Sequence, residues 1–142
     1  MDNNSSFLGK LREEFKKEKV DIKTYSPLSL AYIGDAVYDL VIRSILVSAG
    51  NIPNGQLHKK ATGYVSAVSQ AAIVDKIMGM LTEEEAAVYR RGKNSKPSSS
   101  AKNASQKEYL KATGFEALIG YLYLKDDEDR IIEIVRAGID GI

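Results

Sequence analysis

Residues 26–50 read SPLSLAYIGDAVYDLVIRSILVSAG, a stretch that carries helix-capping signals at both ends. Ser26 suits an N-cap, Pro27 suits the first turn and the closing glycine suits a C-terminal cap, so we predict a helix of about six turns. Apolar side chains go nearly all the way round it, which is typical of a helix at the buried centre of a domain. Gly34 and Asp35 interrupt this pattern together. A buried carboxylate needs a charged partner, a metal ion or a proton, so the question is what Asp35 faces.

Composition limits the class of protein. The chain has 142 residues, 44% hydrophobic and 27% charged, as expected for one soluble globular domain. It has no cysteine and one histidine, which excludes disulfides, thiolate zinc sites, a cysteine nucleophile and a His-rich metal site. The formal net charge is +1, so affinity for nucleic acid would have to come from local basic patches. The polar N-terminus and the lack of an apolar run of about 18 residues favour a cytoplasmic protein without a membrane span.

Helical patterns fill the rest of the chain, and no alternating strand pattern occurs. Thr82 and Glu85 form a capping box, in which each side chain bonds to a backbone N–H of the other, and Ser105 opens a second box. We expect an N-terminal extension with a short helix in residues 1–25, followed by a single domain over residues 26–142. The predicted fold class is all-α, a bundle of about six or seven helices.

A second predicted helix, residues 105–124, repeats the interruption seen in the first. It contains FEALIGYLYL, in which Glu116 lies among apolar neighbours. Thr113 one turn before and Gly120 one turn after are small, which leaves room for another helix or a ligand. If the two helices cross there, Asp35 and Glu116 meet, and two carboxylates in a dry site suit Mg²⁺ with water and a phosphate as further ligands. The alternative, in which each carboxylate pairs with a buried Lys, Arg or backbone group, stays open on pattern alone.

Asp39 allows two interpretations. It lies one turn after Asp35 and could extend the carboxylate face, but it also lies one turn before Arg43, where an ordinary ion pair along the helix is favoured. We therefore place Asp39, together with Thr113, beside the two candidate ligands rather than among them.

Basic residues gather in two stretches. Residues 92–104, GKNSKPSSSAKNA, have no periodicity and predict a loop, and no acid lies among its basic residues or those flanking it. Such a loop suits contact with a phosphate backbone, although a solvated surface loop is the alternative. A smaller cluster begins at His58, where a solvated helix face is favoured over a phosphate contact. The candidate nucleic-acid-binding residues are Arg90, Arg91, Lys93, Asn94, Lys96, Lys102, His58, Lys59 and Lys60.

Two of these stretches together resemble a known family. LAYIGDAVYDLVIR resembles the signature helix of the ribonuclease III endonuclease domain, and FEALIGYLYL resembles that domain's later helix, in the same order and at a fitting separation. LHKKATGYVSAVSQ and RRGKNSKPSSSAKN between them, with no double-stranded-RNA-binding domain expected after them, make the chain similar to Mini-ribonuclease III. The likeness covers about residues 26–139.

The resemblance implies a homodimeric, Mg²⁺-dependent endoribonuclease that cuts double-stranded RNA and leaves 5′-phosphate ends, with precursor 23S ribosomal RNA as the expected substrate. It assigns metal binding and catalysis to Asp35 and Glu116, and it makes a ribosomal protein or a ribosome assembly intermediate a further candidate partner. Larger ribonuclease III enzymes carry a Glu where this chain has Ala31 and an Asp where it has Thr113. The number of metal ions per site therefore stays open.

Two rival functions differ from this expectation. The first is a non-catalytic, ribosome-associated RNA-binding dimer on the same fold, which the two missing carboxylates favour and the retained pair opposes. The second is an all-α nucleotide pyrophosphohydrolase. It is disfavoured because the acidic clusters of this chain lie at predicted helix starts, where they interact with the helix dipole.

Overall fold

The computed structural model describes residues 6–95, 105–140 and 142. These residues form α-helices and short 3₁₀ turns and contain no strand, so the predicted all-α fold class is confirmed. The elements in chain order are α1 (Phe7–Glu14), η2 (Ile22–Thr24), α2 (Pro27–Ser48), α3 (Asn54–Val65), α4 (Ala67–Ile77), η3 (Met78–Met80), α5 (Glu83–Lys93), α6 (Gln106–Leu124) and α7 (Glu128–Gly138).

Local capping signals set the starts of α2, α5 and α6 as the sequence predicts. The Ser26 hydroxyl accepts the backbone N–H of Ser29 at the start of α2. The capping box of Thr82 and Glu85 opens α5, and a second box at Ser105 opens α6. These contacts satisfy N–H groups that have no partner inside the helix, which is why short polar signals fix the boundaries. α5 continues to Lys93, so it includes the first two residues of the predicted loop, 92–104.

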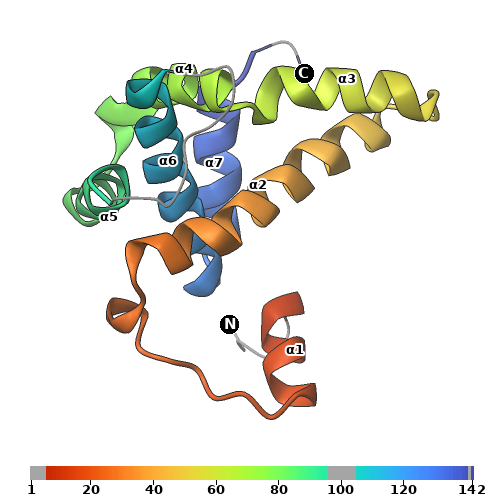
Figure 1. Cartoon of the computed structure of the whole chain (residues 1–142). Helices are drawn as coiled ribbons and strands as arrows, with labels where there is room; N and C mark the ends of the chain where they lie inside the picture. The colour runs from red at the N-terminus through yellow and green to blue at the C-terminus, as the bar shows by residue number, and fades with distance from the viewer. Residues whose placement is uncertain (1–5, 96–104, 141) are drawn as a thin grey trace.

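α6 occupies the centre of the fold, with α2, α4, α5 and α7 packed against it (Figure 1). Phe115, Leu118 and Ile119 on this helix are fully buried. Phe115 also meets Tyr38 of α2 edge to face, with ring centroids 5.1 Å apart. The helix is therefore enclosed on nearly every side, as expected for the central element of a helical bundle.

α2 crosses α6 in backbone contact. A Cβ added to Gly34 would lie 1.7 Å from the carbonyl oxygen of Glu116, and one added to Gly120 would lie 2.0 Å from the carbonyl oxygen of Leu30. No other residue type fits at either position, because a Cβ would overlap the opposing backbone. Gly34, which interrupts the apolar helix in the sequence, thus marks, together with Gly120, the place where the two helix backbones touch.

The expectation that α2 is buried on all sides is wrong for one face. Leu30 and Ile42 are buried, whereas Tyr32 is 84% exposed and Leu40 is 61% exposed. The reason is position, since α2 lies at the edge of the bundle and α6 takes the central place (Figure 1). Neither α2 nor another helix in the described ranges has the length and apolar character that a membrane crossing requires.

A buried ion pair ties α7 to the start of α5. The Arg130 guanidinium donates to both carboxylate oxygens of Glu85, each at 2.8 Å, and to the carbonyl oxygen of Met80 at 2.8 Å. Glu85 is only 6% exposed. Its charge is matched by a bidentate partner, which makes this contact a structural joint of the bundle.

Candidate active site

The crossing of α2 and α6 brings the two predicted carboxylates together. Asp35 follows the glycine that touches the Glu116 backbone, so the two side chains emerge beside each other. Both line one open hollow of about 440 Å³. Its other walls come from Leu28, Ala31, Tyr32, Ile33, Ala36, Tyr109 and Thr113.

The two carboxylates differ in their access to solvent. Glu116 is half-buried between α6 and its neighbours, whereas Asp35 is exposed. The sequence predicts a dry setting for the pair, and this is wrong for Asp35, because it projects from the outer edge of α2. The site is therefore open on one side, where water and a phosphate group can approach.

Among the described residues, no positively charged side chain neutralises the pair. Burial first, and then the neighbouring Asp35 carboxyl, raise the pKa of Glu116 to about 8, while a hydrogen bond from Gln70 acts in the opposite direction. In the described part of the chain, no Lys or Arg forms an ion pair with either carboxylate. The alternative of pairing with a buried base therefore finds no support at these two positions.

The donor set fits a hydrated Mg²⁺ ion. Both donors are hard carboxylate oxygens, they repel each other without a cation, and the open side admits water. Across the described ranges, no cluster of three or more His, Cys, Asp or Glu side chains occurs. Ala31 and Thr113 line the hollow without adding a carboxylate. Mg²⁺ is commonly held by only one or two carboxylates together with water and substrate phosphate.

Gln70 is a third polar side chain at the site, and the sequence analysis missed it. It comes from α4, is 1% exposed, and its Nε2 donates to the Val65 carbonyl at 3.0 Å and to Glu116 Oε2 at 3.4 Å. The sequence did contain a sign of this role, because Gln70 lies one turn before Val74 on the apolar face of α4. A polar residue on a buried helix face calls for a partner.

Asp39 forms the ion pair that the sequence analysis favours. Its Oδ2 lies 3.0 Å from Nε of Arg43, one turn later on α2, and both side chains reach solvent. Thr113 donates its hydroxyl to the carbonyl of Tyr109 within α6, at 3.0 Å. Asp39 is thus engaged outside the carboxylate pair, whereas Thr113 lies in the wall of the site.

The end of α5, which carries several of the basic residues, packs against the part of α6 that carries Glu116. Gly92 packs against Ala117 and Gly114 of α6, which places the end of α5 along this segment. The adjoining candidates are exposed except for the half-buried Lys93, and they are Arg90, Arg91, Lys93 and Asn94. His58, Lys59 and Lys60 are exposed on α3, which packs against α2 and α4. Lys96 and Lys102 lie outside the described residues.

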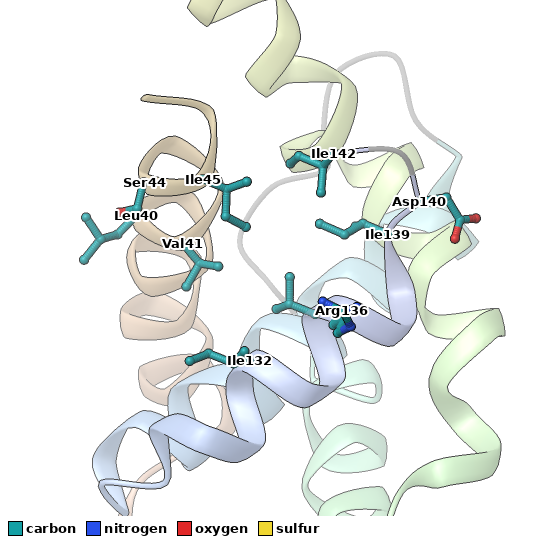
Figure 2. A pocket seen from close by; sticks show the side chains of 10 residues that line it. Leu40, Val41, Ser44, Ile45, Ile132, Arg136, Ile139, Asp140 and Ile142 are labelled. Carbon is teal, nitrogen blue, oxygen red and sulfur yellow. The ribbon is translucent and has the colours of Figure 1, made fainter. Parts of the chain in front are cut away.

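A larger hollow lies between α2 and α7 (Figure 2). It measures about 780 Å³, and the side chains that face it are mainly apolar, with Leu40, Val41 and Ile45 opposite Ile132 and Ile139. Asp140 is the one acid in its lining, and it points away from the apolar walls in Figure 2. The groove has no pair of carboxylates, so the catalytic candidate remains the hollow at the α2–α6 crossing.

Comparison with known proteins identifies the family of this site. A family model of the ribonuclease III domain matches residues 28–127, which include both carboxylates. The chain belongs to the ribonuclease III family. This membership confirms the predicted class of activity, an endoribonuclease of ribonuclease III type.

Relatives of this ribonuclease III chain match it over most of their length. Mini-ribonuclease 3 from Clostridium tetani is 46% identical over 135 residues, which are 94% of this chain and 86% of that protein. Mini-ribonuclease 3 from a Thermoanaerobacter species is 42% identical over 137 residues, 96% of each chain. A crystal structure of a Fusobacterium nucleatum protein has a TM-score of 0.75 at 36% identity, covering 82% of this chain and 93% of that one.

Proposed function

We propose that this ribonuclease III-family enzyme uses Mg²⁺ to cut double-stranded RNA, and that it matures precursor 23S ribosomal RNA as a cytoplasmic homodimer. The meeting of Asp35 and Glu116 in an open hollow carries the proposal, since no cationic side chain among the described residues is paired with either. The relatives named Mini-ribonuclease 3 support an RNA substrate. The absence of cysteine fits a reducing compartment.

The two carboxylates have separate tasks in this proposal. Mg²⁺, when bound, supplies Lewis-acid chemistry that activates water and offsets charge on the phosphodiester. Half-buried Glu116 would hold the cation from the side of the protein interior, and exposed Asp35 would hold it from the solvent side. Because the pKa of Glu116 is about 8 without a cation, this carboxyl must release its proton when metal binds. Cleavage at limiting Mg²⁺ should therefore increase as the pH rises toward that value.

The basic end of α5 would contact the RNA backbone. Arg90, Arg91 and Lys93 are close in sequence to Gly92, which packs on the segment of α6 that carries Glu116, and none of the three is paired with an acid in the described residues. An A-form duplex is recognised mainly by shape, phosphates and 2′-hydroxyls, so charge at this edge suits it. Alanine at all three positions should weaken duplex binding and reduce its dependence on salt. Unchanged affinity and salt slope would remove α5 from the interface.

The exposed apolar face of α2 is the natural dimer surface. Leu28, Tyr32, Leu40 and Val47 share this face and are 40%, 84%, 61% and 59% exposed. Tyr32 also lines the catalytic hollow, so a second copy seated there would complete the wall of the site. A twofold dimer presents two sites, one for each strand of a duplex. Sedimentation should give a dimer for the wild type and a monomer for Tyr32→Asp, and a monomeric wild type would contradict this arrangement.

Cleavage of a long RNA duplex tests the main proposal. The wild type should cut the duplex over a range of Mg²⁺ concentrations and leave 5′-phosphate ends. Asp35→Asn should bind the same duplex but cut it about a thousandfold more slowly, because a metal contributes several kcal/mol of charge stabilisation. Equal cutting by both proteins would remove Asp35 from the mechanism.

A non-catalytic RNA-binding dimer is the rival function, which the family assignment disfavours. Ala31 and Thr113 favour it, because they leave the site with two carboxylates. It predicts duplex binding by the wild type with no cutting at any Mg²⁺ concentration. A ribosomal protein or a ribosome assembly intermediate would be a partner under either proposal.

A further inference from the structure

A buried amide from a third helix reaches the carboxylate pair. Gln70 Nε2 lies 3.0 Å from the carbonyl oxygen of Val65 and 3.4 Å from Oε2 of Glu116. The first contact has the length of a good N–H···O bond, and the second is longer. The side chain is 1% exposed, so the amide is fixed in the core and approaches Glu116 from inside the protein.

The orientation of this amide is determined by its surroundings. Both groups near Nε2 are acceptors, so turning the amide over would place Oε1 against two other oxygens. In the described residues, Oε1 is buried without a hydrogen-bond partner. A buried acceptor without a partner lowers stability, and an apolar side chain of similar size would avoid that loss. Core packing alone therefore does not account for a glutamine at this position.

We propose that Gln70 is a positioning residue for Glu116 in the metal site. Gln70 holds one oxygen of the Glu116 carboxylate and leaves the other for a cation shared with Asp35. A carboxylate that binds through one oxygen suits the compact octahedral shell of Mg²⁺ better than the larger, bidentate shell typical of Ca²⁺. This inference rests on the proposed Mg²⁺-dependent function.

The hydrogen bond from Gln70 to Glu116 is important because the proposed metal site has few protein ligands. Asp35 and Glu116 are the two acids in the lining of the hollow, and Ala31 and Thr113 in its wall add no further carboxylate. With few protein ligands, the orientation of each one contributes more to metal affinity. Groups that orient a metal ligand by hydrogen bonding typically change metal affinity or activity about 10- to 100-fold when they are lost.

Gln70→Met tests the inference, because methionine has a similar length and no donor. Gln70→Leu is a second donor-free variant, and Ile77→Val is the control for a core change two turns further along α4. Calorimetry should measure Mn²⁺ and Mg²⁺ binding to each RNA-free protein, and cleavage assays should measure the Mg²⁺ concentration for half-maximal rate. The KM for duplex RNA and the thermal melting of each variant complete the set.

Both Gln70 variants should bind Mg²⁺ about tenfold more weakly and need about tenfold more Mg²⁺ for half-maximal cleavage. Their KM for RNA should stay unchanged, and their melting temperatures should equal or exceed that of the wild type. Ile77→Val should melt at a slightly lower temperature with unaltered metal affinity.

If both Gln70 variants bound metal as tightly as the wild type, the inference would be overturned. It would also be overturned if both variants unfolded, because Gln70 would then have a purely structural role. A wild-type protein that cuts RNA while the variants bind metal normally would leave the proposed function intact. A wild type that cuts no duplex at any Mg²⁺ concentration would instead refute the proposed function.

Discussion

Two glutamates in the interior of this bundle have opposite surroundings. Glu85 accepts two hydrogen bonds from Arg130 at 2.8 Å and one from the backbone N–H of Thr82 at 2.9 Å. The hydrogen bond from Arg130 is the largest influence that lowers the pKa of Glu85. Glu116 meets another carboxylate and one amide, and burial followed by the proximity of Asp35 raises its pKa to about 8.

The difference separates a structural carboxylate, Glu85, from the one that we propose binds metal, Glu116. Every oxygen of Glu85 has a donor, so its charge ties α5 to α7 and needs nothing further. The ionised form of Glu116 is unfavourable in the absence of a nearby cation. The backbone contact between Gly34 and Glu116 fixes the position of this residue. A raised pKa beside a like charge, in an open hollow, is the pattern expected of a site that binds metal or transfers protons.

The largest effect should come from breaking the helix crossing. In Gly34→Ala the new Cβ would lie 1.7 Å from the carbonyl oxygen of Glu116, so α2 and α6 must separate. We expect a loss of about 3 kcal/mol or more in the free energy of unfolding, measured by urea titration, together with loss of cleavage.

Gly63→Ala is the matched control, because nothing lies within 4 Å of a Cβ at that position in α3. It should stabilise the protein by about 0.5–1 kcal/mol, since alanine favours the helix. Equal stability of the two variants would show that the backbone contact at Gly34 does not hold the crossing together.

The second largest effect should come from removing the charge of Glu85, the structural carboxylate that pairs with Arg130. Glu85→Gln keeps the shape but removes the charge facing Arg130, and we expect about 2 kcal/mol lower stability with cleavage retained at low temperature. The folded-state pKa of Glu85 lies below its ordinary value of 4.5. Its contribution is therefore fully present above that value and is lost as the pH falls through the lowered pKa.

Urea titrations between pH 3 and 7 measure this contribution. The difference in stability between the wild type and Glu85→Gln should shrink toward acid pH. If Glu85→Gln abolished cleavage without lowering stability, the assignment of Glu85 as purely structural would be wrong.

Local signals predicted the helices of this fold, but the crossing depends on distant contacts. The caps at Ser26 and Thr82 involve residues within about four positions, so the sequence alone contains the whole interaction. The sequence also shows that Gly34 and Gly120 are unusual in apolar helices. It does not show that each touches the other helix, because that depends on which helices pack together. Gln70 was missed for the same reason, since its partner Glu116 lies 46 positions away.

The outer face of α2 illustrates a second limit of sequence patterns. Tyr32 and Leu40 belong to an apolar pattern that predicts burial, yet both are exposed in the single chain. A hydrophobic pattern reports that a side chain favours leaving water, and it does not distinguish the chain's own core from the surface of another molecule. Asp35 lies within the same apolar pattern, so the sequence predicted that it is buried, whereas it is exposed on this helix.

The third largest effect is on the pH dependence of folding stability, which should have opposite directions for Glu116 and Glu85. The pKa of Glu116 rises from 4.5 to about 8 on folding, so the folded protein retains a proton that the unfolded chain loses. Metal-free stability should therefore fall as the pH increases between these values, the reverse of the dependence set by Glu85. Glu116→Gln should remove this decline and be about 1 kcal/mol more stable than the wild type at pH 9, the scale of a like-charge pair near water.

Thermal melting with and without Mg²⁺ measures this effect. Added Mg²⁺ should stabilise the wild type at pH 9 but not Glu116→Gln. An identical response of both proteins to Mg²⁺ would place the ion elsewhere.

The smallest effect should come from Asp39, whose carboxylate is neither buried nor part of the pair. Its partner Arg43 lies 3.0 Å away on the exposed side of α2, and such pairs contribute about 0.3–0.5 kcal/mol. Asp39→Asn should therefore lower stability by about that amount and leave the Mg²⁺ dependence of cleavage unchanged. Asp75→Asn, which breaks the surface pair with Lys111 at 2.8 Å, is the matched control. If Asp39→Asn alone needed about tenfold more Mg²⁺ for cleavage, the Asp39 carboxylate would belong to the metal site. The proposed metal ligands would then be Asp35, Asp39 and Glu116 rather than Asp35 and Glu116 alone.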